Sequence, residues 1–362
     1  MSESATASAP AKTQPKAKKN RLSSGFFRFV LTRFLLIIPT VFILVTIVFF
    51  VMRATGDPIS AAMGGRLTPE ELQRRIHAAG YDRPLVVQYL DYLGGLLRGD
   101  LGTTLTDNQP VTTILTRYGA ATFELAFLSL IVALIVGIGL GRLAARRRDH
   151  AADAGIRVFA ILCYATPVFF LGLMLKLVFA VWLNVLPPSG RSSFASDMQF
   201  QRLVSPTGFY IIDAFQLGDM SVLVDVLRHA VLPALALGLL TAGVFIRLVR
   251  TNVISTYNSG YVEAARSRGV SEKRLLNKHA WRPALIPIIT VMGMQIALML
   301  AGAVLTETTF EWKGLGFMLS QYLKQRDFVA VQGIVILIAI IVAVVNFIVD
   351  VISALIDPRV RY

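Results

Sequence analysis

The sequence from Thr32 to Met52, TRFLLIIPTVFILVTIVFFVM, decides the class of fold. Its only charged side chain is Arg33, near the start of the stretch. A helix needs about 20 predominantly apolar residues to cross the hydrocarbon core of a bilayer. A helix is favoured there because it pairs every backbone N–H and C=O group within the segment. The stretch therefore predicts a transmembrane helix in an integral membrane protein.

Similar apolar blocks recur along the chain, separated by polar stretches. Hydrophobic residues make up 55% of the 362 residues and charged residues only 16%, whereas a soluble domain carries about 25% charged residues. We predict an all-α, polytopic membrane protein with six transmembrane helices. The expected spans are approximately 32–52, 121–141, 157–183, 230–249, 284–306 and 329–356.

The basic residues predict how these spans are oriented. The net charge is +14, and the Lys and Arg residues lie between apolar blocks. That placement fits the positive-inside rule better than a nucleic-acid surface, which would interleave aromatic side chains with Arg. The second and fourth connections are rich in Arg. We therefore expect both connections and both termini to face the cytoplasm, in a multi-pass protein of the plasma membrane. Residues 1–25, rich in Ala, Ser, Pro and Lys, are expected to form a disordered basic cytoplasmic tail.

The first outer loop, residues 53–120, contains two helix signals. Thr68, Pro69 and Glu71 form an N-terminal capping pattern, and Gly80 ends that helix. From Pro84 onward, apolar residues recur on one helical face. We predict an amphipathic helical outer loop that lies on the membrane or on a partner. The third loop, around 184–229, is expected to be an irregular external cap.

The fourth connection, residues 258–282, predicts a helix, a glycine turn, a second helix and a stop at proline. Asn258 or Ser259 can cap the first helix, Gly269 permits a sharp turn, and Ser271 can cap the second helix. Small Ala side chains would let a partner approach closely. Such a cytoplasmic elbow suits the docking of another protein. The alternative is an ordinary amphipathic connector, positively charged for topology, and the residues alone leave both interpretations open.

A resemblance favours docking. Glu263-Ala264-Ala265, then Gly269 and Ile286-Pro287, resemble the EAA signature of ABC-importer permeases. Over about residues 28 to 362, the sequence is similar to the first permease subunit of the dipeptide and oligopeptide importers (the DppB/OppB type). Further segments that carry the resemblance are Gly56-Asp57-Pro58, residues 81–89, 94–102, 229–235, Glu307 to Gly316, and 357–362. One departure is Glu311-Trp312-Lys313-Gly314, where the family usually has Ser-Trp-Pro-Gly.

This resemblance implies a type I ABC-importer permease domain over residues 26–362, and a set of partners. They are a second homologous permease, two ABC ATPase subunits, an extracytoplasmic peptide-binding protein and the lipid bilayer, without nucleic acid. The implied function is ATP-driven import of di- or oligopeptides. The residues expected to fit a groove on the ATPase are Glu263, Ala264, Ala265, Arg266, Arg268, Gly269 and Val270.

No enzymatic activity is expected of this chain. The sequence contains no Gly-Lys-Ser or Gly-Lys-Thr, and therefore no phosphate-binding Walker A loop. The ATPase activity, and the binding of ATP and Mg²⁺, would belong to the partner chains. The four histidines are far apart and show no metal-ligand spacing. We therefore predict no catalytic residue, no metal site and no cofactor in this chain.

Polar and flexible residues within the spans are candidates for the substrate pathway. Our candidates are Met292, Gln295 and Met299 in the fifth span, and Asn346 and Asp350 in the sixth. Packing between helices is the alternative at each position. Two other charged residues have structural interpretations: Lys176 is expected to snorkel or to pair with a neighbouring helix, and Glu124 to cap the second span.

A secondary transporter or channel acting without ATP is the alternative function. Such a protein would place coupling-ion carboxylates near midspan or show inverted repeats, and neither is evident in the sequence. A membrane scaffold that transports nothing is a third class. Co-isolation with a P-loop ATPase separates both from an ABC permease.

Overall fold

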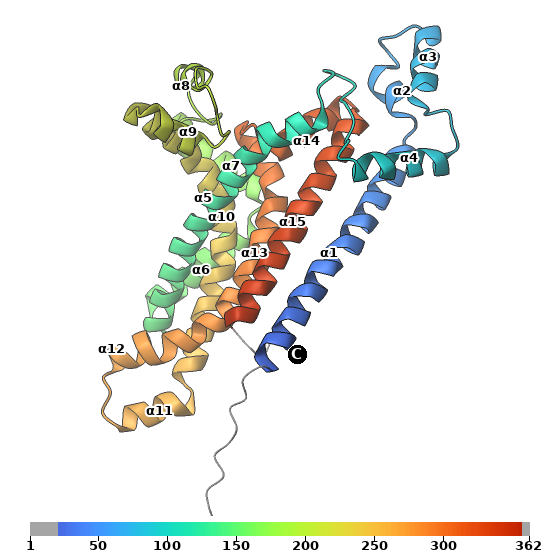
Figure 1. The fold of residues 1–362 in the computed structure, drawn as a ribbon. Coiled ribbons are helices and arrows are strands. Elements are labelled where there is room, and N and C mark those ends of the chain that lie inside the picture. The colour runs from blue at the N-terminus through green and yellow to red at the C-terminus, as the bar shows by residue number, and fades with distance from the viewer. Residues whose placement is uncertain (1–20, 357–362) are drawn as a thin grey trace, which may run out of the picture.

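The computed structural model describes residues 21–356, and its elements are helices apart from one isolated β-bridge between Thr103 and Pro110. The predicted all-α class is therefore confirmed. Figure 1 shows long helices aligned in a bundle, with short helices gathered at its two ends. Residues 1–20 of the predicted tail lie outside the described residues. Residues 21–25 are helical, because α1 begins at Arg21.

Two helices, α5 (Val111–Arg146) and α10 (Met220–Tyr257), form the centre of the bundle. They approach closely because α5 presents glycine at the contact. A Cβ added at Gly137 would lie 2.5 Å from the Cβ atom of Phe245 on α10. Small residues at such crossings bring helix backbones together and increase van der Waals packing in a membrane.

The remaining long helices pack around this pair. The helix α13 (Trp281–Phe310) contacts α10, and α15 (Phe328–Ile356) contacts α13. The first helix, α1 (Arg21–Ala54), packs mainly on α15 and leaves most of its apolar side chains exposed. Figure 1 shows α1 at the edge of the bundle.

Four helices of the described chain, α1, α5, α10 and α15, are long and apolar enough to cross a membrane. A bent pair, α6 (Ala151–Ala165) followed by α7 (Val168–Leu175) and η1 (Lys176–Trp182), makes a fifth if it is counted as one span. In the fifth predicted range, α13 is a helix of 30 residues but is not among these. The count of six spans therefore stays a prediction.

The third expected span, 157–183, is not one continuous helix. It bends by 109° between α6 and the α7–η1 segment. Thr166 adopts an extended conformation with ψ 126° directly before Pro167. Proline disfavours the helical conformation of the preceding residue and lacks an N–H to continue the ladder. The Thr166-Pro167 dipeptide therefore explains the bend.

The two helices that local signals predict in the outer loop are present. It forms α2 (Pro58–Met63), α3 (Pro69–Ala79) and α4 (Leu85–Leu97). Thr68 caps α3 by accepting the N–H of Glu71, and Gly80 ends that helix with φ +72°. Figure 1 shows these helices at one end of the bundle, which we call the α4 end.

The third loop is more regular than expected. Two short helices, α8 (Phe194–Phe200) and α9 (Tyr210–Leu217), share a small apolar core with the start of α10. The prediction of an irregular cap is therefore wrong, because Phe200, Ala214 and Val226 supply enough buried surface to hold helices together. A further helix, α14 (Leu315–Lys324), also lies at the α4 end.

Candidate functional site

The helical elbow predicted between the fourth and fifth spans is present. The chain leaves α10 and forms α11 (Gly260–Ser267), turns at Gly269, and continues through α12 (Glu272–Arg274) and η2 (Leu275–Ala280) into α13. Gly269 has φ +79°, a conformation that disfavours any side chain. We call residues 260–280 the elbow, and the end of the bundle that carries it the α11 end (Figure 1).

An apolar interior fixes the shape of the elbow. Val262 on α11 and Leu275 on η2 are fully buried. Across the hairpin, the hydroxyl of Tyr261 donates to the carbonyl of His279 at 3.4 Å. The two arms are thus held together by packing as well as by the turn.

Three local details of the elbow differ from expectation. Ser259 and Ser271 occupy N-cap positions, but neither side chain makes a capping hydrogen bond. The hydroxyl of Ser259 donates instead to the carbonyl of Thr256. The expected stop at proline is wrong, because α13 continues through Pro287. Helices in membrane proteins tolerate proline where neighbouring groups compensate for the lost hydrogen bond.

A network of charges crosses the outside of the elbow. Arg266 forms ion pairs with Glu263 and, at 2.8 Å, with Glu272, and its guanidinium lies 5.0 Å from the centre of the Tyr257 ring. The hydrogen bonds from Arg266 and Tyr257 lower the pKa of Glu272 below its ordinary value. The carboxylate side chains are 67% exposed at Glu263 and 60% exposed at Glu272. Such exposed pairs contribute little to stability.

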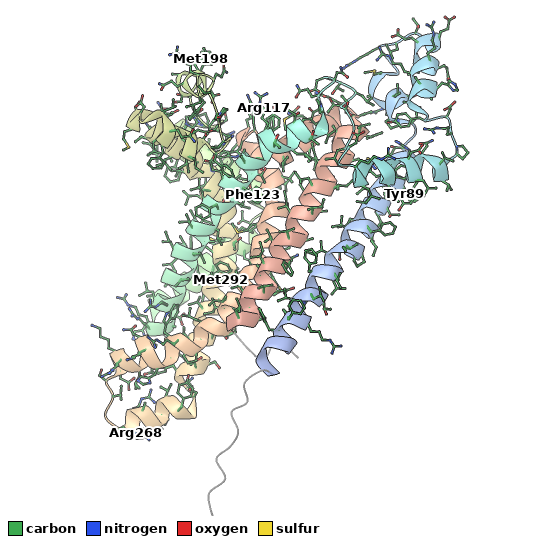
Figure 2. All side chains as sticks on the ribbon, viewed as in Figure 1. Tyr89, Arg117, Phe123, Met198, Arg268 and Met292 are labelled. Atoms are coloured by element: carbon green, nitrogen blue, oxygen red, sulfur yellow. The ribbon has the colours of Figure 1, made fainter. Side chains whose placement is uncertain are left out.

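The expected coupling residues all lie on the elbow, and four of the seven are exposed. Glu263, Ala264, Arg268 and Gly269 are exposed, while Ala265, Arg266 and Val270 are half-buried. Figure 2 shows Arg268 at the far end of the elbow, away from the bundle. Small exposed side chains beside charged ones would allow close approach of another backbone and provide charge pairing.

The elbow is also joined to α5, a connection that the sequence did not reveal. The side-chain carbonyl of Asn277 accepts hydrogen bonds from Arg146 and, at 3.3 Å, from Arg142. The guanidinium of Arg142 lies 4.4 Å from the centre of the Trp281 ring. A pocket of about 510 Å³ lies between the ends of α5 and α10 and the second arm of the elbow, with Tyr257 and Lys273 among its lining residues. A displacement of the elbow would therefore act on α5 as well as on α13.

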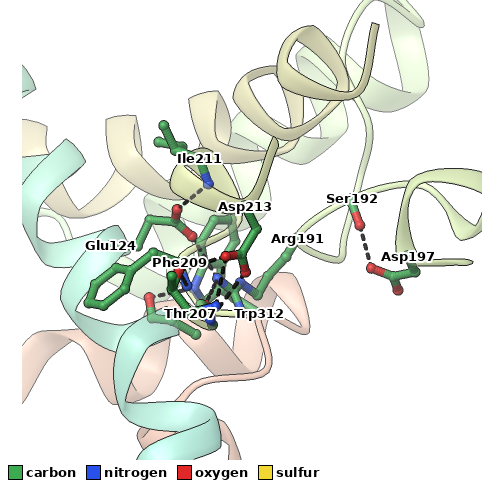
Figure 3. A network of polar contacts seen from close by, with 11 residues as sticks. Glu124, Arg191, Ser192, Asp197, Thr207, Phe209, Ile211, Asp213 and Trp312 are labelled. Carbon is green, nitrogen blue, oxygen red and sulfur yellow. Dashed lines mark hydrogen bonds and ion pairs between the residues drawn. The ribbon is translucent and has the colours of Figure 1, made fainter. Parts of the chain in front are cut away.

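The α4 end holds a second polar cluster, and this one is buried. The carboxylate of Glu124 on α5 accepts a hydrogen bond from Arg191 at 2.7 Å and another from the backbone N–H of Ile211 at 2.8 Å. Arg191 also donates to the carbonyl of Gly208 and lies 3.7 Å from the centre of the Tyr210 ring. Figure 3 shows these groups converging from α5 and the third loop. The expectation that Glu124 caps a helix is wrong, because α5 begins 13 residues earlier, at Val111.

A neighbouring set of contacts closes the turn after α13. The indole N–H of Trp312 donates to the carbonyl of Ala121 at 2.9 Å, and the hydroxyl of Thr122 donates to Glu307 at 2.7 Å. Trp312 and Glu307 are fully buried. Gly314 lies against Glu307, so closely that an added Cβ would be 2.4 Å from its carboxylate oxygen. We call Thr122, Glu124, Arg191, Glu307 and Trp312 the buried cluster.

Comparison with known proteins identifies the family. Residues 137–362 match the family model described as the inner membrane component of binding-protein-dependent transport systems. Residues 26–125 match the family model for the N-terminal part of such membrane components. This chain belongs to that family. It is a multi-pass membrane permease subunit of an ABC importer, and not the ATPase. Partners of the family include an ATPase and a substrate-binding protein.

Several relatives resemble this permease over almost their whole length. The di/tripeptide transport system permease of Pseudomonas aeruginosa (strain UCBPP-PA14) is 37% identical over 92% of this chain and 98% of its own. The dipeptide transport system permease of Escherichia coli (strain K12) is 37% identical over 92% and 99%. Among solved structures, the inward-facing MetNI methionine ABC transporter has a TM-score of 0.49 at 14% identity, covering 68% of this chain and 97% of that chain.

The candidates for the substrate pathway in the permease lie in different surroundings. Met299 is buried with Leu237 and Trp312, and Met292 packs on a cluster near the α11 end. Gln295 is half-buried and Asn346 is exposed. The role of these residues in a pathway stays a prediction.

Two charged residues within the spans have clear partners. The carboxylate of Asp350 on α15 pairs with Arg33 on α1 at 3.3 Å, which fits the alternative of helix–helix contact. The ammonium of Lys176 donates to the carbonyl of Thr309 at 2.9 Å, so Lys176 pairs with a neighbouring helix as expected.

Proposed function

We propose that this permease forms half of a peptide pathway and is driven by ATPases that dock on the elbow. The observation that carries the proposal is the elbow itself: a hairpin with a packed apolar interior, on which Glu263, Ala264, Arg268 and Gly269 are exposed. A second homologous permease would supply the other half of the path, and two ATPase subunits would bind the two elbows. ATP and Mg²⁺ would be bound by those subunits, and this chain would perform no covalent chemistry.

The proposed orientation places the α11 end in the cytoplasm, where ATP is available. In Figure 1, α1 begins and α15 ends at the α11 end, so both termini would be cytoplasmic. The concentration of Arg and Lys at this end, including Arg146 and Lys273 beside the pocket, agrees with the positive-inside rule. The α4 end would then face the extracytoplasmic receptor.

The proposed mechanism moves the elbow as a lever. Closure of the ATPases on ATP would shift the elbow, and its contacts through Asn277 to Arg142 and Arg146 would pass the shift to α5. The bundle would change between inward- and outward-facing states. Its partners would bias that two-state equilibrium by binding the two states differently.

The proposed cargo is a small peptide. Relatives that are 37% identical over nearly their whole length are named as dipeptide or di/tripeptide permeases. The receptor would deliver the peptide to the loops at the α4 end, including α8, α9 and α14.

Reconstitution tests both parts of the proposal. The full importer in proteoliposomes, with its receptor, should take up a labelled dipeptide only when ATP is supplied. Uptake driven by an ion gradient without ATP would contradict the proposal, and ATP-dependent uptake of another cargo would overturn the peptide assignment alone.

Pull-down of the ATPase then tests the docking surface. The variant Glu263→Lys should lose the ATPase, whereas Glu70→Lys, exposed on α3 at the opposite end, should retain it. Equal recovery of the ATPase by both variants would exclude the elbow as the docking site.

A further inference from the structure

One face of α4 carries apolar side chains that no part of the described chain covers. The exposed fractions are 67% at Val86, 61% at Leu90 and 90% at Leu97. The spacings of four and seven residues place all three on one side of the helix, because two helical turns take about seven residues. We call these three residues the α4 stripe.

The opposite face of α4 is fixed to α1, so the stripe cannot turn inward. Gln88 is buried, and its amide oxygen accepts a hydrogen bond from Arg53 at 2.9 Å while its amide nitrogen donates to the carbonyl of Tyr81. The hydroxyls of Tyr89 and Thr46 are hydrogen-bonded at 2.7 Å. These contacts set the rotation of α4 about its own axis.

The stripe adjoins an exposed apolar surface of α1, which would face lipid in a bilayer. On α1, Ile43, Ile47 and Phe50 are exposed along a helix apolar enough to span the membrane. The Tyr89 ring on α4 lies 5.4 Å from the ring of Phe50. Figure 1 shows α4 lying across the end of α1, below α2 and α3, and Figure 2 shows Tyr89 at this junction.

We propose that α4 is an interfacial helix whose Val86, Leu90 and Leu97 side chains insert into the membrane leaflet at the α4 end. Amphipathic helices of this kind lie in the plane of the interface, with the apolar face at the boundary between headgroups and acyl chains. Arg83 precedes the helix and Arg98 follows it, and both are exposed. The cationic group of Arg98 would lie at the level of the lipid phosphates, and Arg83 would lie there as an ion pair with Asp91 at 2.9 Å, with the stems along the apolar boundary.

The membrane is the occupant that the structure favours, because the exposed apolar side chains of the span-length helix α1 lead directly to α4. The proposal does not depend on the cargo or on the ATPase. It depends only on the placement of the bundle in a bilayer.

Spin labelling of the assembled importer in lipid nanodiscs tests the proposal. A cysteine-free background is available through Cys163→Ala, since Cys163 is the only cysteine, and each labelling site then adds a single cysteine. Labels at Val86→Cys, Leu90→Cys and Leu97→Cys should collide several-fold more often with oxygen, which concentrates in lipid, than with a water-soluble nickel chelate. Labels at Glu70→Cys and Arg74→Cys, exposed on α3, should show the reverse ratio.

Two results would overturn the proposal. One is equal access of the nickel chelate to the stripe and to the α3 positions. The other is access of the chelate to the stripe in the bilayer, together with labels that become immobilised only when the receptor is added. That result would assign the stripe to receptor docking. If a labelled stripe variant fails to assemble, brominated lipids provide a second measurement on Leu90→Trp: its fluorescence should be quenched more strongly than that of Arg74→Trp.

Discussion

The elbow and the buried cluster use the same chemical groups in opposite surroundings. At the elbow, Arg266 pairs with two glutamates and lies 5.0 Å from a tyrosine ring. In the buried cluster, Arg191 pairs with Glu124 and lies 3.7 Å from a tyrosine ring. The glutamates at the elbow are more than half exposed, whereas the side chain of Glu124 is 4% exposed.

This difference in exposure suits the buried cluster to stability and the elbow to coupling. A buried charge that loses its partner remains desolvated, so the pair between Glu124 and Arg191 is costly to break. An exposed pair is solvated whether it is formed or broken, so the contacts of Arg266 can rearrange at low cost. We infer that the buried cluster fixes the third loop on the bundle, and that the elbow network would be free to exchange partners in the proposed complex with an ATPase.

The largest effect on stability is expected from Arg191→Ala. This change leaves Glu124 buried without its cation and removes the donor to Gly208. Loss of one partner of a buried pair costs about 3–5 kcal/mol. The melting temperature in detergent should fall strongly, measured by the reaction of Cys163, which is buried in the folded protein, with a thiol-reactive dye.

Arg202→Ala is the matched control, because Arg202 is exposed in the same loop. It should melt as the unmodified protein does. The double variant Glu124→Leu with Arg191→Met should recover much of the lost stability, since apolar replacements remove both charges. Identical melting of Arg191→Ala and Arg202→Ala would show that the buried pair does not hold the loop.

Gly314→Ala is expected to have the next largest effect. Its Cβ would lie 2.4 Å from the buried carboxylate of Glu307, which cannot move far because Thr122 and the N–H of Phe317 bind it. Overpacking of this kind costs about 1–3 kcal/mol. Gly65→Ala is the control, since Gly65 is exposed and a Cβ there meets nothing within 4 Å. A normal melting temperature for Gly314→Ala would argue against a tight turn at Trp312.

Gly269→Ala should separate coupling from stability. An alanine at φ +79° costs about 1–2 kcal/mol, and this strain falls on the turn of the elbow. Receptor-stimulated ATPase activity should fall several-fold, while the melting temperature of the bundle changes less than in Arg191→Ala.

Gly260→Ala is the matched control for the turn. It lies in α11 with a helical backbone and open space around it, so activity should persist. If Gly260→Ala and Gly269→Ala reduced the activity equally, the geometry of the turn could not be the cause.

Local signals in the sequence predicted the parts of the fold that depend on neighbouring residues. The cap at Thr68, the end of α3 at Gly80 and the turn at Gly269 all follow from single residues and their conformational preferences. Hydropathy indicated where the long helices lie but not where they end, because α10 extends from Met220 to Tyr257, well past the expected 230–249.

Contacts between distant residues could not be predicted in the same way. Glu124 and Arg191 are 67 positions apart, and no sequence pattern near either residue indicates that they form a pair. The positive-inside rule already accounted for Arg142 and Arg146. Their hydrogen bonds to Asn277 on the elbow were therefore not predicted. Where a residue has several plausible roles, only the tertiary structure shows which contacts it makes.

The smallest expected effect is the response of the elbow to acid. Hydrogen bonds from Arg266 and Tyr257 lower the pKa of Glu272 in the folded protein below its ordinary value of 4.5. The stabilisation from this carboxylate is therefore complete above the ordinary value, and is lost as the pH falls through the lowered pKa. A spin label at Arg268→Cys should keep constant mobility near neutral pH and become more mobile in acid. With Glu272→Gln added, the label should already be more mobile at neutral pH and respond less to acid. An acid response that is the same with and without Glu272→Gln would assign the titration to another group, and would show that the hydrogen bonds of Glu272 add nothing to the order of the elbow.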